Sequence, residues 1–211
     1  MIDNILAITG GMGTGKSTVL NLFEKNGFNV VNSDQEVATL FSSEYKNYIS
    51  LANDFDNWLK TNFTKQSCID KKILRKYIET SEDGFKKSMD IVKPYISERL
   101  LELAQTYSGK KVVFEIPVLF EAKMESYYKN ILVVTAPLDV RLKRIQLRQP
   151  HLSLAQIQQT IDSQLPEIIK IKKANFVLDN SGTLEQLENK FNNMLPEILN
   201  IYAPAKLKPK Y

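Results

Sequence analysis

The sequence has very few of the residues that build covalent cross-links or metal centres. One cysteine, Cys68, and one histidine, His151, occur among 211 residues. A lone cysteine cannot form an internal disulfide and is typical of a protein kept in a reducing cytoplasm. A metal centre or catalytic triad built on histidine would depend wholly on His151, which follows Pro150 in a polar stretch and is predicted to lie at the surface. We therefore expect a cytoplasmic protein that has neither a disulfide scaffold nor a Cys/His metal site.

Long apolar runs and strong charge are lacking as well. No apolar run approaches the roughly 18 residues that a membrane-spanning helix needs, and the first 20 residues do not have the pattern of a secretory signal. The net charge is +4, from 28 Lys and Arg against 24 Asp and Glu, which is too small to indicate nucleic-acid binding. Lys206, Lys208 and Lys210 supply much of this excess and predict a solvated tail. We expect neither a membrane nor a nucleic acid as a partner.

Glycine is scarce but concentrated at one place. Of the 8 glycines, Gly10, Gly11, Gly13 and Gly15 fall within six positions, between an apolar run at 5–8 and a helical spacing of apolar residues at 19–23. Residues 10–17 match G-x-x-x-x-G-K-[ST], a loop whose N–H groups and following helix N-terminus face a phosphate. In this phosphate loop Lys16 would reach the β- and γ-phosphates and Ser17 would ligate Mg²⁺. The motif predicts binding of a nucleoside triphosphate.

The apolar pattern predicts an α/β fold. Helical spacings separate most of five short apolar runs, which is typical of a parallel sheet covered on both faces. The predicted strands are 5–9, 28–32, 112–116, 131–135 and 176–179. Between the second and third strands only helical spacings recur. We predict a P-loop nucleotide-binding core at 1–42 and 107–211, with a lid at about 141–172, and a helical insertion at 43–106 that holds the acceptor substrate.

Several charged residues have two interpretations at this stage. Asp34 directly follows the second strand, where it could be a general base or the N-cap of the next helix. Glu115 ends the third strand, where it could hold a water bound to Mg²⁺ or cap the strand. Arg141, Arg144 and Arg148 share a helix face by their spacing and could either neutralise phosphates or form a solvated surface.

The reaction class follows partly from motifs that are missing. The Asp-x-x-Gly and Asn-Lys-x-Asp motifs of GTPases are absent, and so is the Leu-Ser-Gly-Gly-Gln element of transporter ATPases. A small-molecule kinase needs a phosphate loop, a carboxylate near the acceptor and a cationic closing segment, and the chain has candidates for all three. A nucleotide-dependent switch without an acceptor is the alternative from a different class.

A set of motifs in chain order resembles the dephospho-CoA kinase family. The phosphate loop at 9–18 is similar to the opening of that family, and Asn32-Ser33-Asp34 stands where the family has Asp-Ala-Asp. Further segments that resemble family motifs are 69–75, Lys93-Pro94, 116–121, Arg141 to Arg144 with Arg148, Gln164, and 174–182. The similarity spans about residues 5–185, which is most of the chain.

The resemblance implies that ATP phosphorylates the ribose 3′-hydroxyl of dephospho-CoA, giving CoA and ADP in the last step of CoA synthesis. It makes Asp34 the general base and has Lys16, Arg144 and Arg148 act on the transferred phosphoryl group. The implied ATP site comprises Gly11, Met12, Gly13, Thr14, Gly15, Lys16, Ser17, Thr18 and Asn180, and the implied acceptor site comprises Asp34, Arg75, Lys93, Pro117, Leu119 and Glu121. ATP and Mg²⁺ are the expected co-substrate and metal. We expect a monomer or a weak homo-oligomer.

Two departures from the family pattern keep alternatives open. Asn32 replaces the first aspartate of its pair, and Lys93 replaces a histidine. An inactive family member, or a P-loop kinase for another small acceptor such as a nucleoside monophosphate or a sugar acid, would also fit the phosphate loop.

Overall fold

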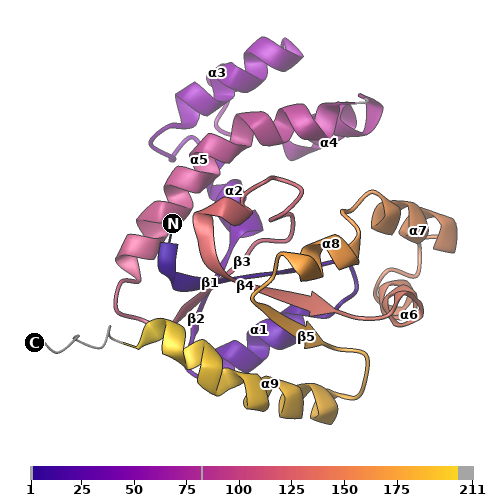
Figure 1. Cartoon of the computed structure of the whole chain (residues 1–211). Coiled ribbons are helices and arrows are strands. Elements are labelled where there is room, and N and C mark those ends of the chain that lie inside the picture. Colours follow the sequence, from indigo (N-terminus) through magenta and orange to yellow (C-terminus); the bar gives the residue numbers. More distant parts are fainter. Residues whose placement is uncertain (1, 82, 204–211) are drawn as a thin grey trace, which may run out of the picture. The chain divides into compact units, whose positions relative to one another are not determined.

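The structure, a computed structural model, describes residues 2–81 and 83–203 (Figure 1). The lysines of the expected solvated tail, Lys206, Lys208 and Lys210, lie outside these residues. The sheet has five strands in the order β2-β3-β1-β4-β5, and β1 pairs in parallel with both β3 and β4, as β4 does with β5. The strands are β1 (Ile2–Gly10), β2 (Asn29–Asn32), β3 (Val112–Glu115), β4 (Tyr128–Thr135) and β5 (Phe176–Asp179).

The five predicted strands are confirmed, with shifted ends. β1 begins at Ile2 rather than at residue 5, and β4 begins at Tyr128 rather than at residue 131. The early residues of β4 include the exposed Lys129, so this part of the strand has no apolar run that sequence inspection could detect. Apolar runs mark only the part of a strand that is buried on both faces.

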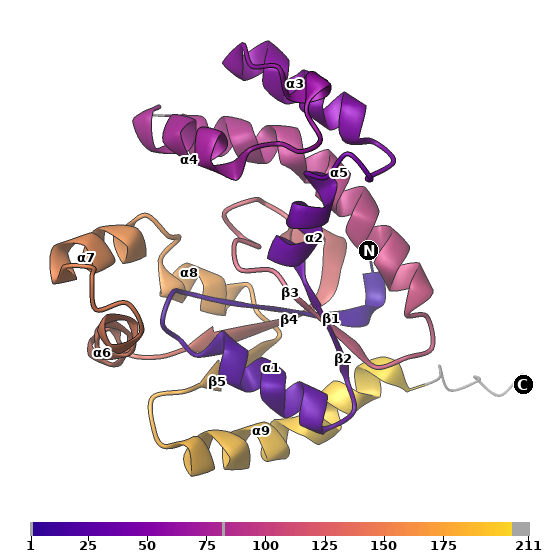
Figure 2. The ribbon, with the colours of Figure 1, turned by 180° about the vertical axis from the view of Figure 1, so that it is seen from behind.

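Helices cover both faces of the sheet. The helices α1 (Lys16–Lys25) and α9 (Leu184–Leu199) lie on one face, and α8 (Glu167–Lys172) lies on the other (Figures 1 and 2). Consecutive β1 residues from Leu6 to Ile8 are fully buried, as expected for a strand covered on both sides. Phe23 of α1 meets Phe191 of α9 edge to face at 4.8 Å between ring centroids. These contacts fix the helix that follows the phosphate loop against the sheet.

Three short helices form the predicted lid region. They are α6 (Leu138–Arg148), α7 (Leu154–Asp162) and α8, and together they are called the lid helices here. The sequence predicts a helical stretch interrupted near Pro150 and Pro166, and the breaks lie at these prolines, because proline removes a helix hydrogen bond and clashes with the preceding turn. Ile145, Ile157 and Ile161 join α6 to α7 in a small apolar cluster of their own.

A second, helical part follows β2. It contains α2 (Ser33–Leu40), α3 (Tyr48–Leu59), α4 (Lys71–Thr80) and α5 (Gly84–Thr106). In α3 the buried residues Tyr48, Leu51, Ala52, Phe55 and Leu59 follow the 3.6-residue period. The helical spacings that the sequence shows in this region are thus present as helices.

The chain divides into two compact units, residues 1–31 with 107–211 and residues 32–106. Helix α2, which the sequence boundary at residue 42 assigns to the core, groups with the helical unit. Arg99 of α5 donates from Nε to Glu36 Oε2 of α2 at 2.8 Å, which ties α2 to that unit. Among the helices of the described residues, none combines the length and the apolar character that a membrane crossing requires.

Candidate functional site

The phosphate loop connects β1 to α1 through backbone shapes that favour glycine. β1 ends at Gly10 and α1 begins at Lys16. Gly13 and Gly15 have φ angles of 80° and 88°, in the left-handed region that other residues rarely adopt. Gly15 is the N-cap of α1 and has no side chain to accept a hydrogen bond from the first-turn N–H groups. The loop therefore presents an uncapped helix N-terminus, which is a site suited to an anion.

Two side chains stabilise the loop by donating hydrogen bonds to its own carbonyl oxygens. The Lys16 ammonium donates to the carbonyl oxygens of Gly10 at 2.8 Å and Gly11 at 3.2 Å. Thr14 is fully buried, and its hydroxyl donates to Gly11 O at 2.9 Å. Ser17, the predicted Mg²⁺ ligand, is exposed in the first turn of α1. The charged and hydroxyl groups that the motif assigns to phosphate and metal therefore gather at one helix end.

A pocket of about 310 Å³ lies beside this helix end. Asn180 lines it, is only 5% exposed, and donates from Nδ2 to Thr14 O at 2.8 Å. Arg144 lines the same pocket, and its Nη2 lies 3.5 Å from Asn180 Oδ1. Its Nη1 is enclosed without a hydrogen-bond partner among the residues described. The pocket is lined by Gly15, Thr18, Arg144, Asn180, Gly182, Leu184 and Leu187.

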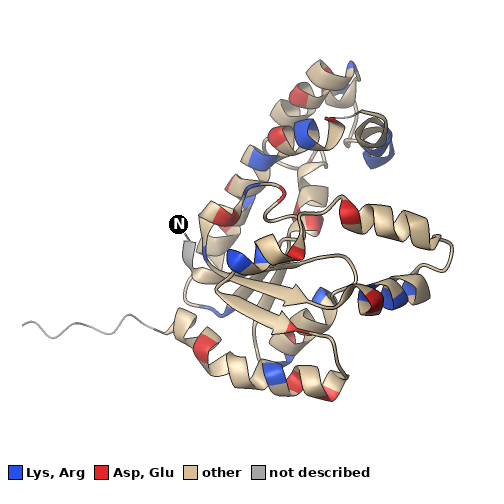
Figure 3. Cartoon of the chain, turned by 45° about the vertical axis from the view of Figure 1, so that its right-hand side comes forward, with Lys and Arg blue, Asp and Glu red and all other residues tan. Residues whose placement is uncertain are grey.

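The three arginines of α6 have different surroundings. Lys and Arg residues recur along this helix, which is marked blue at these positions in Figure 3. Arg148, at the last position of α6, is exposed and does not line the pocket that holds Arg144. Arg141 is only 7% exposed, so for this residue the interpretation as a solvated surface is wrong. The structure brings Arg141 and Arg144 to the phosphate loop, and it leaves Arg148 at the surface.

Met12 attaches the phosphate loop to the lid helices. Its N–H donates to Gln164 Oε1 at 3.0 Å, and its carbonyl oxygen accepts from Arg141 Nε at 2.8 Å. Its side chain packs against the apolar cluster of Ile145, Ile157 and Ile161. The Met12 amide, which the resemblance includes in the ATP site, is thus occupied by a glutamine in this structure. Sequence reasoning assigned no role to Gln164 beyond its match to a family motif, and for Arg141 it left phosphate neutralisation and a solvated surface open without indicating a contact with the loop.

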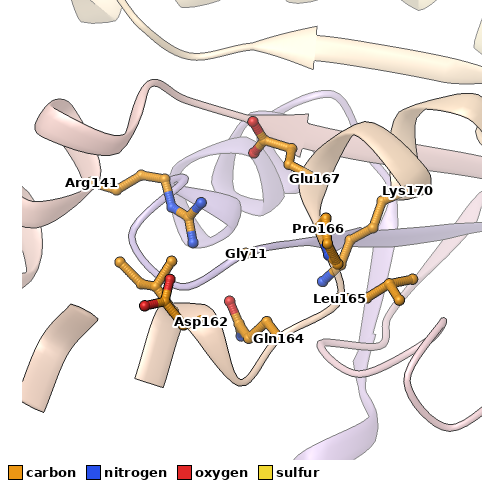
Figure 4. Close-up of a pocket in the computed structure, with 9 residues that line it drawn as sticks. Gly11, Arg141, Asp162, Gln164, Leu165, Pro166, Glu167 and Lys170 are labelled. Carbon is orange, nitrogen blue, oxygen red and sulfur yellow. The ribbon is translucent and has the colours of Figure 1, made fainter. Parts of the chain in front are cut away.

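A second cavity, of about 220 Å³, lies between the loop and the lid helices. Arg141, Gln164 and Glu167 surround it, with Gly11 of the loop behind them (Figure 4). Burial lowers the pKa of Arg141, and the nearby Glu167 carboxylate opposes that shift. Burial raises the pKa of Glu167, whereas the positive charge of Arg141 lowers it. A Cβ on Gly11 would lie 2.6 Å from Arg141 Nη2, so the guanidinium rests directly against the loop.

The segment after β3 lies mostly inside the protein. Pro117 accepts a hydrogen bond at its carbonyl oxygen from the Thr9 hydroxyl at 3.3 Å. Leu119 is fully buried. Glu121 forms an ion pair with Lys170 at 2.6 Å, although the resemblance groups it with the acceptor site. Glu115, at the end of β3, is 9% exposed.

The other predicted acceptor residues belong to the helical unit. Asp34 is the second residue of α2 and is exposed, Arg75 is exposed on α4, and Lys93 is half-buried before Pro94 within α5. Asn32, not Asp34, is the N-cap of α2: its Oδ1 accepts from Asp34 N at 2.9 Å and Gln35 N at 3.2 Å. The interpretation of Asp34 as an N-cap is therefore wrong, and its carboxylate takes no part in the cap.

Asn32→Ala should lower the free energy of unfolding by about 1 kcal/mol, because two helix N–H groups lose their acceptor. Asn32→Asp should keep the wild-type stability within a few tenths of a kcal/mol, since aspartate caps about as well as asparagine. Urea denaturation of the three proteins measures both differences. Equal stabilities for Asn32→Ala and wild type would contradict the assignment of the cap.

Comparison with known protein families matches this chain to one family over most of its length. The family model described as dephospho-CoA kinase matches residues 4–186. A dephospho-CoA kinase of Arabidopsis thaliana is 32% identical over 200 residues, which cover 92% of this chain and 83% of that protein. One of Fusobacterium nucleatum is 30% identical over 186 residues, covering 88% of this chain and 94% of that protein.

Solved structures agree with the sequence comparison. TT1252 from Thermus thermophilus has a TM-score of 0.69 at 30% identity and covers 92% of this chain and 96% of its own. A dephospho-CoA kinase from Campylobacter jejuni has a TM-score of 0.67 at 27% identity, with the same coverage of 92% and 96%. A shikimate kinase from Acinetobacter baumannii, at a TM-score of 0.52 and 16% identity, shares the fold. The predicted α/β P-loop kinase fold is confirmed.

Proposed function

The chain belongs to the dephospho-CoA kinase family, and on that premise we propose that it transfers the terminal phosphoryl group of ATP to the ribose 3′-hydroxyl of dephospho-CoA. The products are CoA and ADP, and the reaction is the final step of CoA synthesis. The observation that carries the proposal is the phosphate loop, with Lys16 folded over the loop carbonyls, in a chain that matches the family from residue 4 to residue 186.

The phosphate loop and α6 supply the positive charge that stabilises the phosphates of ATP during transfer. Lys16 and the amides at the start of α1 are suited to the β- and γ-phosphates, because phosphoryl transfer depends mainly on positioning and on neutralising negative charge. Arg144 lines the pocket beside the helix end, and its Nη1 is buried without a hydrogen-bond partner among the described residues. Arg148 lies one helical turn further along α6. It would join Arg144 at the transferred phosphoryl group when α6 moves over the nucleotide. Asp34 supplies the base for the acceptor hydroxyl.

Ser17 would hold Mg²⁺ through its hydroxyl together with phosphate oxygens. In the described part of the chain, no group of three or more His, Cys, Asp or Glu side chains is arranged to hold a metal. Magnesium bound with a nucleotide does not need such a cage, because it keeps several waters and takes phosphate oxygens as ligands. The exposed Ser17 in the first turn of α1 fits this type of site. Bound Mg²⁺ would offset negative charge on the phosphates.

Acceptor binding is proposed for the helical unit and for the segment after β3. Arg75 and Lys93 are cationic groups that suit the pyrophosphate of dephospho-CoA. Pro117 lies at the start of the segment after β3, where its ring could meet an apolar part of the substrate. Leu119 would shape this segment from the interior, where it is fully buried. The contacts of Glu121 suggest a different role, which is argued below.

The function is tested by ADP release from ATP and Mg²⁺ in the presence of dephospho-CoA, adenosine, AMP, gluconate or no acceptor. We expect strong stimulation by dephospho-CoA alone, with CoA identified as the product by mass. Turnover with another alcohol and none with dephospho-CoA would assign the chain to a different small-acceptor kinase. Nucleotide binding without turnover on any alcohol would favour a nucleotide-dependent switch or an inactive family member.

A further inference from the structure

Glu121 is held inside the protein by two donors. Its side chain is 12% exposed, and its Oε1 accepts from Lys170 Nζ at 2.6 Å and from the Leu165 N–H at 3.1 Å. Its Oε2 is enclosed and has no hydrogen-bond partner among the described residues. Lys170 is itself only 1% exposed. The carboxylate therefore offers little surface to a substrate, and it compensates a buried ammonium.

The chain segment that Glu121 holds also contacts the phosphate loop. Leu165, whose N–H Glu121 holds, directly follows Gln164, whose side-chain oxygen accepts the Met12 N–H at 3.0 Å. Glu121 also holds Lys170 on α8, so it fixes the chain at two points within six residues. A shift of this segment would withdraw the Gln164 oxygen from Met12.

Met12 is well placed to transmit such a shift to the nucleotide site. It precedes Gly13, whose left-handed φ of 80° turns the loop toward the helix end. A Cβ on Gly13 would lie 2.9 Å from the Arg141 carbonyl oxygen, so α6 leaves this turn little room to move. Contacts with the lid helices thus set the backbone of residues 11–13. The amides at the start of α1, which are proposed to bind phosphate, come directly after this part of the loop.

We infer that Glu121 and Gln164 are positioning residues of the nucleotide site: Glu121 fixes the segment at 164–170, and Gln164 holds the phosphate loop through Met12. The inference rests on nucleotide binding at this loop, which is part of the proposed function. It does not depend on which alcohol accepts the phosphoryl group. It replaces the acceptor-binding role that the resemblance implies for Glu121.

The test is calorimetric titration of the full chain with ADP and Mg²⁺, together with the KM for dephospho-CoA. Gln164→Met removes the acceptor for Met12, and Glu121→Gln removes the charge opposite Lys170. Each should weaken ADP binding roughly three- to tenfold, the scale of one hydrogen bond. The double variant should be little weaker than either single variant, because both act through one contact. The KM for dephospho-CoA should not rise.

Glu125→Gln is the matched control. Glu125 forms an ion pair with Lys173 at 2.7 Å, and this pair also joins the region after β3 to the end of α8 but is more exposed than the pair of Glu121. It should leave ADP affinity unchanged. Wild-type ADP affinity in Glu121→Gln with a raised KM for dephospho-CoA would overturn the inference, and so would additive losses in the double variant.

Gln164→Met keeps the test decisive if Glu121→Gln does not fold, since Gln164 is half-buried and makes no ion pair. Unchanged ADP affinity in Gln164→Met would overturn the inference by itself. If wild type binds ADP but does not phosphorylate dephospho-CoA, the proposed function fails, and the comparison of ADP affinities still decides the role of these residues.

Discussion

Lys16→Ala should lower ATP turnover by about a thousandfold or more, because the variant removes the one motif side chain that brings a full positive charge to the β- and γ-phosphates. The ammonium also donates to Gly10 O at 2.8 Å and to Gly11 O at 3.2 Å, so its loss loosens the loop as well as removing charge. We therefore expect weaker ADP binding together with a lower kcat. Steady-state ADP release and ADP titration measure the two effects.

Lys25→Ala is the matched control for this experiment. Lys25 is exposed in the last turn of the same helix, α1, at the end opposite the phosphate loop. Its removal costs a few tenths of a kcal/mol at most in helix-dipole interaction, and activity should stay within about twofold of wild type. Retention of more than a tenth of wild-type turnover in Lys16→Ala would show that the loop does not bind the reacting phosphates.

The parts of the fold that could be predicted from the sequence are those fixed by local pattern. A parallel strand buried on both faces needs a nearly continuous apolar run, so the middle of β1, with Leu6 and Ile8 fully buried, was visible in the sequence. The phosphate loop was visible because its glycines and Lys16 are neighbours in the chain. The first residues of β4, which include Lys129, could not be predicted, because an exposed polar residue in a strand has the same sequence signal as a residue in a loop.

The lid contacts could not be predicted in this way, because they join residues far apart in the chain. Arg141 and Met12 are separated by 129 positions, and Gln164 and Met12 by 152. A basic residue on an amphipathic helix is usually solvated, and only the packing of α6 against the loop shows that Arg141 is enclosed. The match of Gln164 to a family motif was the one signal that singled it out, and it carried no physical role.

The interpretation of Asp34 as the N-cap of α2 was wrong for a different reason. Asparagine and aspartate cap helices about equally well, so Asn32 and Asp34 were both chemically acceptable. The choice depends on whether the helix begins at residue 33 or at residue 35, and helix ends are the least certain part of a sequence prediction. The helix begins at Ser33, so the cap is Asn32, and the asparagine that departs from the family pattern has a structural role.

Asp34→Asn should lower kcat by two or more orders of magnitude while leaving the affinities for ATP and dephospho-CoA within about threefold of wild type. The substitution keeps the size and removes the proton acceptor, and loss of a general base costs typically a hundredfold to ten-thousandfold. Because Asn32 caps α2, the Asp34 carboxylate is not needed to start the helix. Unchanged stability in urea is therefore part of the expected result.

Asn32→Ala separates a chemical role of Asp34 from an effect on α2. It weakens the start of the same helix but keeps the carboxylate, so kcat should fall far less than in Asp34→Asn. A kcat loss of equal size in both variants would mean that the placement of α2 matters and that Asp34 is not the base. Wild-type kcat in Asp34→Asn would exclude the base role directly, because an amide cannot take the proton from the attacking hydroxyl at neutral pH.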